Sequence, residues 1–198
     1  MGDDAGMDAI VIGASAGGVE ALAVLLPALP AGSLVPVFVV LHQPRHRPSL
    51  IVNVFGPRCK VPVREAEDKE PVSGGTIYFA PPDYHLLIDR GESGMQLALS
   101  ADPPILFSRP SVDALFESAA DAYGSRLLGI ILTGASRDGA SGLAAVGGAG
   151  GRTVVQDPAT AAVPLMPRAA AERWPAADLK SLDAIAAMMS GIARGDRP

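Results

Sequence analysis

The stretch AIVIGASAGG at residues 9–18 decides the fold, because four apolar residues run straight into a glycine-rich turn. A short apolar run of this kind is typical of a strand that is buried on both faces of a parallel sheet. A helix is expected from about residue 19 to residue 26. The stretch therefore predicts a buried strand, a sharp turn and a helix, with Ser15 at the centre of the turn.

Strands and helices continue to alternate along the chain. We predict further strands at residues 37–41, 127–132 and 153–156, and helices at about 49–55, 111–123, 140–151 and 182–192. Between residues 61 and 99, short alternating runs at 76–80, 85–88 and 95–99 look like inserted hairpins. The expected fold class is α/β: a doubly wound, mostly parallel sheet with helices on both faces and an inserted antiparallel hairpin region.

The composition indicates a compact domain that folds without disulfides. Of the 198 residues, 48% are hydrophobic and 19% are charged, as in ordinary globular proteins. Residues 9–193 are expected to form one catalytic domain, with tails at 1–8 and 194–198.

Cys59 is the single cysteine, and no run of Cys and His has zinc-ligand spacing, so we expect a reducing compartment and no metal. The net charge of −5, without a Lys/Arg cluster, argues against a nucleic-acid partner.

One uncharged stretch, residues 21–41, is long enough to cross a bilayer. Pro27, Pro30 and Pro36 divide it into a helix end, a turn and a strand, which argues against insertion. The acidic N-terminus lacks the charged and then apolar pattern of a signal peptide. We expect a cytoplasmic protein that does not insert into a membrane.

A glycine-rich turn after the first strand fits more than one kind of site. In the dinucleotide-binding pattern G-x-G-x-x-G, the second glycine lets the backbone approach pyrophosphate. That position is Ser15 here, and the second strand ends at His42 rather than at an acidic residue for the ribose. In a nucleophile elbow, the glycines of Gly13-x-Ser15-x-Gly17 would permit a sharp turn that exposes the serine hydroxyl. Ser15 could also simply cap the helix.

Two possible partners for Ser15 follow other predicted strands. His42 comes directly after strand 37–41, and Asp138 lies in the loop that leaves strand 127–132. The carboxyl ends of parallel strands meet at one edge of a sheet, so we interpret the three residues as a catalytic triad. A surface histidine and an Asp-Gly turn are the alternatives for each residue taken alone. The chain order Ser, His, Asp excludes an α/β-hydrolase fold, whose order is Ser, Asp, His.

Several longer motifs accompany these residues: IGASAGG at 12–18, LH at 41–42, GTIYFAPPDYH at 75–85, RPSVDALF at 109–116, LTGASRDG at 132–139, QD at 156–157 and MP at 166–167. As a set they resemble the catalytic domain of the chemotaxis receptor methylesterase family, known as CheB. The match extends over almost the whole chain. The resemblance implies hydrolysis of γ-glutamyl methyl esters on receptor signalling helices, often with deamidation of particular glutamines, and neither a metal nor an organic cofactor.

By position, the resemblance makes Ser15 the nucleophile, His42 the general base and Asp138 the carboxylate that orients the imidazole. Main-chain N–H groups near Ala16 and Ala135 are expected to stabilise the oxyanion.

Two further motifs are open to two interpretations each. His85 matches a histidine near the site in the family, and either contacts substrate or has a structural role. Residues 109–113 either bind substrate or form a capped helix start.

The sequence departs from the family pattern near the expected oxyanion site. Ala16 replaces the usual threonine, and Gly134-Ala135-Ser136 replaces the common Gly-Met-Gly. Backbone donors survive these changes, so we expect the chemistry to persist and the substrate fit to differ. Only eight residues precede the first strand, so we expect no N-terminal receiver domain and no response to small phosphodonors.

Two functions from other classes compete with the esterase. One is a nucleotide-binding module built on the glycine-rich turn, which Ser15 and His42 weaken. The other is a catalytically idle module of the same fold that docks receptors or signalling partners, against which the intact triad argues. We expect a monomer.

Overall fold

The fold is described from a computed structural model, for residues 6–43, 50–92 and 94–194. One seven-stranded sheet runs through the centre in the order β3-β4-β2-β1-β7-β8-β9, and every neighbouring pair is parallel. Its strands are β1 (Ala9–Ala14), β2 (Val37–Leu41), β3 (Val63–Glu65), β4 (Ile77–Phe79), β7 (Leu127–Ile131), β8 (Arg152–Gln156) and β9 (Asp178–Lys180). The predicted doubly wound α/β sheet is confirmed.

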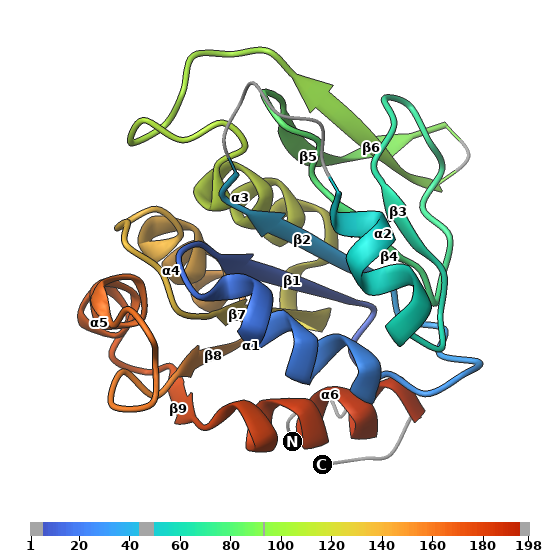
Figure 1. The fold of residues 1–198 in the computed structure, drawn as a ribbon. Helices are drawn as coiled ribbons and strands as arrows, with labels where there is room; N and C mark the ends of the chain where they lie inside the picture. Colours follow the sequence, from blue (N-terminus) through green and yellow to red (C-terminus); the bar gives the residue numbers. More distant parts are fainter. Residues whose placement is uncertain (1–5, 44–49, 93, 195–198) are drawn as a thin grey trace.

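Helices cover both faces of the sheet (Figure 1). They are α1 (Gly18–Leu25), α2 (Ile51–Phe55), α3 (Val112–Tyr123), α4 (Ala140–Gly148), α5 (Leu165–Arg173) and α6 (Leu182–Arg194). Successive residues of β1 point to opposite faces. Ile10 and Ile12 join a core with residues of α1, α2 and α6, whereas Val11 joins a second core with residues of α3, α4 and α5.

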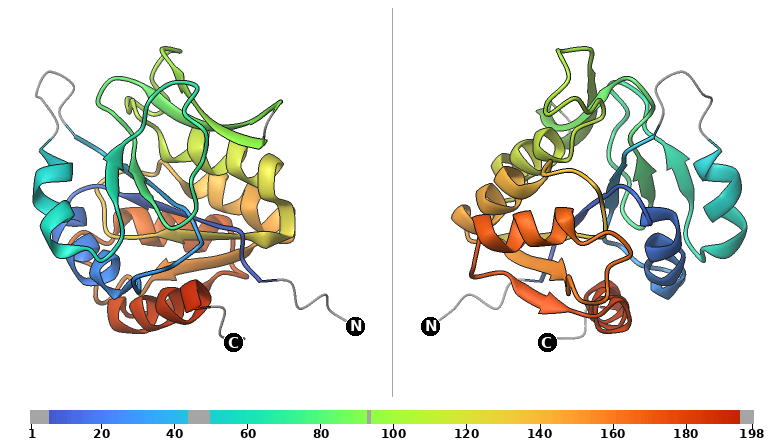
Figure 2. Two further views of the ribbon diagram at one scale, coloured as in Figure 1. Left: turned by 90° about the vertical axis from the view of Figure 1, so that its right-hand side faces the viewer. Right: turned by 60° about the vertical axis from the view of Figure 1, so that its left-hand side comes forward.

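The inserted hairpin consists of β5 (His85–Gly91) and β6 (Gly94–Ser100), which pair antiparallel outside the main sheet. It packs over α3, where the Ile88 N–H donates to Ser118 Oγ at 3.1 Å. Figure 2 shows this hairpin on the opposite side of α3 from the sheet. The prediction of hairpins at 85–88 and 95–99 is therefore confirmed.

The prediction that residues 76–80 form part of the hairpin region was wrong. Within that run, β4 lies between β2 and β3 and is parallel to both. Ile77, Tyr78 and Phe79 are all fully or almost fully buried, as a strand covered on both faces must be. The short polar turns around β4 resemble hairpin turns. All three side chains of β4 can be buried only in the central sheet, which is covered on both faces.

Candidate active site

Ser15 lies in a sharp turn at the carboxyl end of β1. Its N–H donates to the carbonyl of Thr133 at 3.0 Å, and its own carbonyl accepts from the Gly18 N–H at 2.8 Å. Gly17 adopts φ 78°, a left-handed conformation that glycine tolerates at little cost. Ser15 is half-buried. The turn thus has the strand-turn-helix geometry that a nucleophile elbow requires.

His42 lies beside this turn at the end of the neighbouring strand. Ala14 is in register with Leu41, and the His42 N–H donates to the Ala14 carbonyl at 3.0 Å. The residues after β1 and β2 are consequently side by side. On its other side the imidazole Nε2 lies 2.8 Å from Asp138 Oδ2.

Asp138 is fully buried, and four donors surround its carboxylate. Oδ2 accepts from His42 Nε2 and from the Val112 N–H at 2.7 Å, whereas Oδ1 accepts from Ser111 Oγ at 2.7 Å and the Asp113 N–H at 3.0 Å. Ser111 to Asp113 begin α3, so the carboxylate sits at the positive end of that helix dipole. Burial alone would raise the pKa of Asp138, but the bonds from His42 and the start of α3 hold that pKa below its ordinary value of 3.8.

The ionised Asp138 fixes which imidazole nitrogen can act as the base. A carboxylate can only accept hydrogen bonds, so Nε2 carries the proton in the neutral ring and Nδ1 is left with a free lone pair. In the serine protease template the carboxylate holds Nδ1 instead. The ring is therefore connected in the opposite sense, and Nδ1 is the nitrogen whose lone pair could accept a proton.

The residues expected at the oxyanion site are both exposed and lie near Ser15. A Cβ added to Gly134 would come within 2.8 Å of the Ser15 Cβ, which places the start of this loop against the serine. Ala16 and Ala135 are exposed, and their N–H groups donate to no acceptor among the residues that the structure describes. Their role as oxyanion donors stays a prediction that this geometry supports.

His85 is 1% exposed, and main-chain groups engage both of its ring nitrogens. The Ser111 N–H donates to Nδ1 at 3.1 Å, so Nε2 carries the proton and donates to the Pro103 carbonyl at 3.2 Å. These contacts favour the structural role over contact with substrate. His85 holds Ser111, which in turn holds Asp138.

The RPSVD segment shows the geometry of a capped helix start. The Ser111 hydroxyl caps α3 by accepting from the Ala114 N–H at 3.4 Å. The Arg109 guanidinium donates to Asp83 Oδ1 at 2.8 Å and to the carbonyl groups of Ala101 and Asp102. The same segment supplies three of the four donors to Asp138, a role that we did not predict.

Other supporting residues were also missed. The Gln156 side chain accepts from the Thr133 N–H at 2.9 Å, and Thr133 Oγ1 donates to the Ala16 carbonyl at 2.9 Å. Ser136 Oγ accepts from the Asp138 N–H at 3.1 Å. The family motifs contain Thr133 and Gln156, but only the three-dimensional contacts show that they hold the serine turn.

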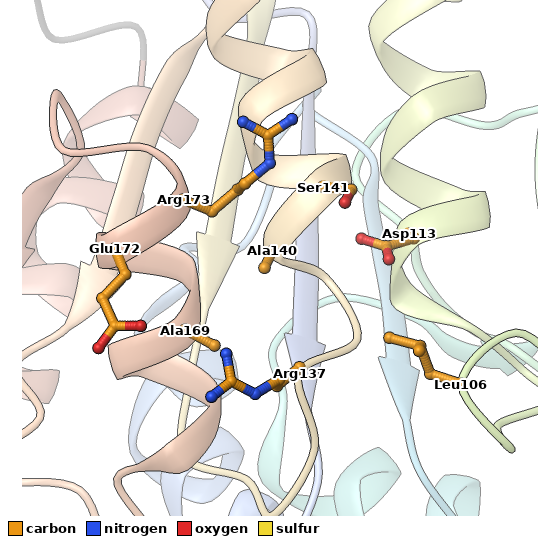
Figure 3. Close-up of a pocket in the computed structure, with 8 residues that line it drawn as sticks. All are labelled: Leu106, Asp113, Arg137, Ala140, Ser141, Ala169, Glu172 and Arg173. Carbon is orange, nitrogen blue, oxygen red and sulfur yellow. The ribbon is translucent and has the colours of Figure 1, made fainter.

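A cavity of about 360 Å³ lies near Asp138, between α3, α4 and α5 (Figure 3). Neither Ser15 nor His42 lines it, so it is separate from the triad. Within the described residues, no group of three or more His, Cys, Asp or Glu side chains could hold a metal ion. None of the helices that the structure describes is long and apolar enough to cross a membrane.

A doubly wound sheet that brings a serine turn, a histidine and a buried carboxylate to one edge has the architecture of a serine hydrolase. The family model for CheB methylesterase matches residues 10–189. The chain belongs to the CheB methylesterase family.

Relatives and a solved structure agree with this assignment. A putative protein-glutamate methylesterase/protein-glutamine glutaminase of Leptospira interrogans is 42% identical over 179 residues, which are 90% of this chain and 91% of that protein. Protein-glutamate methylesterase/protein-glutamine glutaminase 1 of Dechloromonas aromatica is 42% identical over 81% of this chain, which corresponds to 46% of the longer relative. The crystal structure of the Thermotoga maritima CheB methylesterase catalytic domain superposes with a TM-score of 0.90 at 30% identity, covering 95% of this chain and all of that one.

Proposed function

We propose that this chain hydrolyses methyl esters of glutamate side chains on a protein, releasing methanol and the free carboxylate. The hydrogen bond between His42 and the buried Asp138, beside the Ser15 turn, carries the proposal. The names of its relatives supply the substrate class: protein-glutamate methylesterase and protein-glutamine glutaminase. The same site would deamidate glutamine by releasing ammonia in place of methanol.

The first half of the reaction transfers the acyl group to Ser15. Its Oγ attacks the ester carbonyl carbon while the hydroxyl proton passes to His42 Nδ1, and the Ala16 and Ala135 N–H groups stabilise the oxyanion. The resulting imidazolium is supported by Asp138 through Nε2. When the tetrahedral intermediate collapses, the C–O bond to the methoxy group breaks and Nδ1 returns the proton, so methanol leaves.

The second half regenerates the enzyme. Water attacks the acyl-enzyme carbonyl while Nδ1 takes its proton, and collapse of the second intermediate returns that proton to Ser15 Oγ. The products are free enzyme and the glutamate carboxylic acid, which releases its proton to solvent to give the carboxylate. No step needs a metal or an organic cofactor.

The proposed substrates are the methylated signalling helices of chemotaxis-type receptors, which would place the protein in the cytoplasm. The absence of nucleic-acid binding and of membrane insertion, the monomeric state and the extent of the catalytic domain remain predictions from the sequence. A catalytically idle docking module is the alternative function. The enclosed hydrogen bonding of Asp138, which a docking surface does not need, favours the enzyme.

Methanol release from a methylated receptor tests the proposal. Ser15→Ala should remove nearly all of the activity, because no nucleophile remains, while circular dichroism shows an unchanged fold. Ser181→Ala removes a helix cap at the start of α6 and is the matched control, which should retain the wild-type rate. Equal methanol release by wild type and Ser15→Ala would reject the proposal.

A further inference from the structure

Helices α3 and α4 both begin beside Asp138. A carboxylate at the start of each helix accepts hydrogen bonds from the first N–H groups of the other, and we call this arrangement the exchange. Asp138, two residues before α4, accepts from the first N–H groups of α3. Asp113, in the first turn of α3, accepts in return from the N–H groups of Gly139 at 2.9 Å and Gly142 at 2.7 Å, at the start of α4. The carboxylate at the start of each helix therefore accepts from N–H groups at the N-terminus of the other helix, which have no acceptor within their own helix.

This exchange requires close approach of α4 to α3, and glycines provide it. A Cβ on Gly142 would lie 2.6 Å from the Phe116 Cβ and 3.0 Å from the Asp113 Cα. Gly139 has φ 96°, and a Cβ there would lie 2.7 Å from the side chains of Val112 and Ile131. The loop that carries Asp138 is consequently clamped between the sheet and the first turn of α3.

Both bonds from α4 end on the same oxygen of Asp113, Oδ1. The residue is 6% exposed, and its carboxyl points from α3 toward the start of α4, where it lines the cavity with Arg137 and Ser141 (Figure 3). An isosteric amide would keep an oxygen at this place, whereas a shorter side chain would leave two buried N–H groups without an acceptor.

We propose that Asp113 is a positioning residue for the esterase reaction, holding the start of α4 so that the Asp138 carboxylate keeps its place against His42. The inference rests on the proposed function. Its physical basis is that Gly139 directly follows Asp138, so any displacement of the Gly139 N–H moves the catalytic carboxylate. A shift of about 1 Å in a catalytic group can reduce the rate on the order of a hundredfold.

The test compares Asp113→Ala and Asp113→Asn by their rate of labelling with a fluorophosphonate, which reports Ser15 and His42 without any receptor substrate. Asp113→Ala should react at least tenfold more slowly than wild type, and Asp113→Asn should stay within about threefold, since its Oδ1 can accept both bonds. Ser181→Ala loses the cap of α6, which makes no contact in the exchange between Asp113 and Asp138, and should label at the wild-type rate. In proton NMR, the far-downfield signal of the His42 Nε2–H should persist in Asp113→Asn and broaden or move in Asp113→Ala.

A wild-type labelling rate and an unchanged imidazole signal in folded Asp113→Ala would overturn the inference. Asp113→Ser, whose hydroxyl is too short to bridge both N–H groups, serves as the second variant and should behave like the alanine variant. If both variants fail to fold while Ser181→Ala folds, Asp113 serves stability alone and the inference is also overturned. Failure of the wild type to label would instead reject the proposed function, so the two failures are distinguishable.

Discussion

At the scale of single residues, Asp113 and Asp138 show how two neighbouring buried carboxyls acquire opposite properties. The pKa of Asp138 is held below its ordinary value, because the bonds from His42 and the start of α3 outweigh the cost of burial. Burial raises the pKa of Asp113 to about 6, and the negative charges of Asp138 and Glu117 add to that effect against the opposing bonds from Gly142 and Gly139. The two shifts have opposite signs, so Asp138 loses its proton at lower pH than Asp113 does.

The raised pKa of Asp113 predicts a pH dependence of stability. Between its ordinary value of 3.8 and about 6 the folded state binds more protons than the unfolded state, so this group's contribution to the free energy of unfolding falls as pH rises. Asp113→Asn removes this pH-dependent contribution to the free energy of unfolding, because the amide does not titrate. Its stability relative to wild type should therefore increase between pH 4 and pH 7, by at most about 3 kcal/mol, and then level off.

Urea unfolding of both proteins across this pH range measures the difference. The charged groups that also face the cavity, Arg137, Glu172 and Arg173, are the same in both proteins and cancel. Ser181→Ala, which changes no titratable group, is the control and should show no comparable trend. A pH-independent difference between Asp113→Asn and wild type would contradict the account.

At the scale of elements, the contact between α3 and α4 predicts a large effect from a single methyl group. Gly142→Ala should lower the free energy of unfolding by about 1–3 kcal/mol, because the new Cβ meets the Phe116 side chain and the Asp113 backbone. Gly148→Ala, in the same helix with nothing within 4 Å of the added Cβ, should stabilise by about 0.5–1 kcal/mol. Urea unfolding of the pair measures both values, and equal effects of the two substitutions would show that α4 does not pack as described.

The elements also show what the sequence predicts and where it fails. The strands that precede Ser15, His42 and Asp138 are continuous apolar runs, and their boundaries were predicted to within one or two residues. Helix α5 was missed because Pro167 interrupts its pattern near the start, where a helix tolerates proline. Strands β3 and β9 are three residues long and lie at the sheet edges, which leaves too few residues for a pattern.

The sequence likewise predicts some features of the site and misses others. The meeting of Ser15, His42 and Asp138 at one sheet edge could be predicted because each follows a recognisable strand. The exchange between Asp113 and Asp138 could not, since it depends on the spatial approach of two helix starts that are separated by a whole strand in the sequence.

At the scale of the whole molecule, the sheet order brings the three residues together. Strand β1 lies between β2 and β7, so Ser15, His42 and Asp138 leave three adjacent strands at one edge. The helix after β1 belongs to the core on one face, whereas the helix after β7 belongs to the core on the other. Ligands of open α/β sheets bind where helices from adjacent strands pass to opposite faces of the sheet in this way. All groups that the proposed chemistry needs therefore come from this one sheet and its loops.

The most direct test of the central claim is to treat the 198-residue chain with a fluorophosphonate and to map the modified residue by peptide mass spectrometry. We predict one adduct, on Ser15, that is absent in Ser15→Ala and strongly reduced in folded His42→Ala, because the hydroxyl needs the imidazole as its base. An adduct on another residue, or equal labelling of folded Ser15→Ala, would contradict the assignment of Ser15, His42 and Asp138 as the catalytic triad.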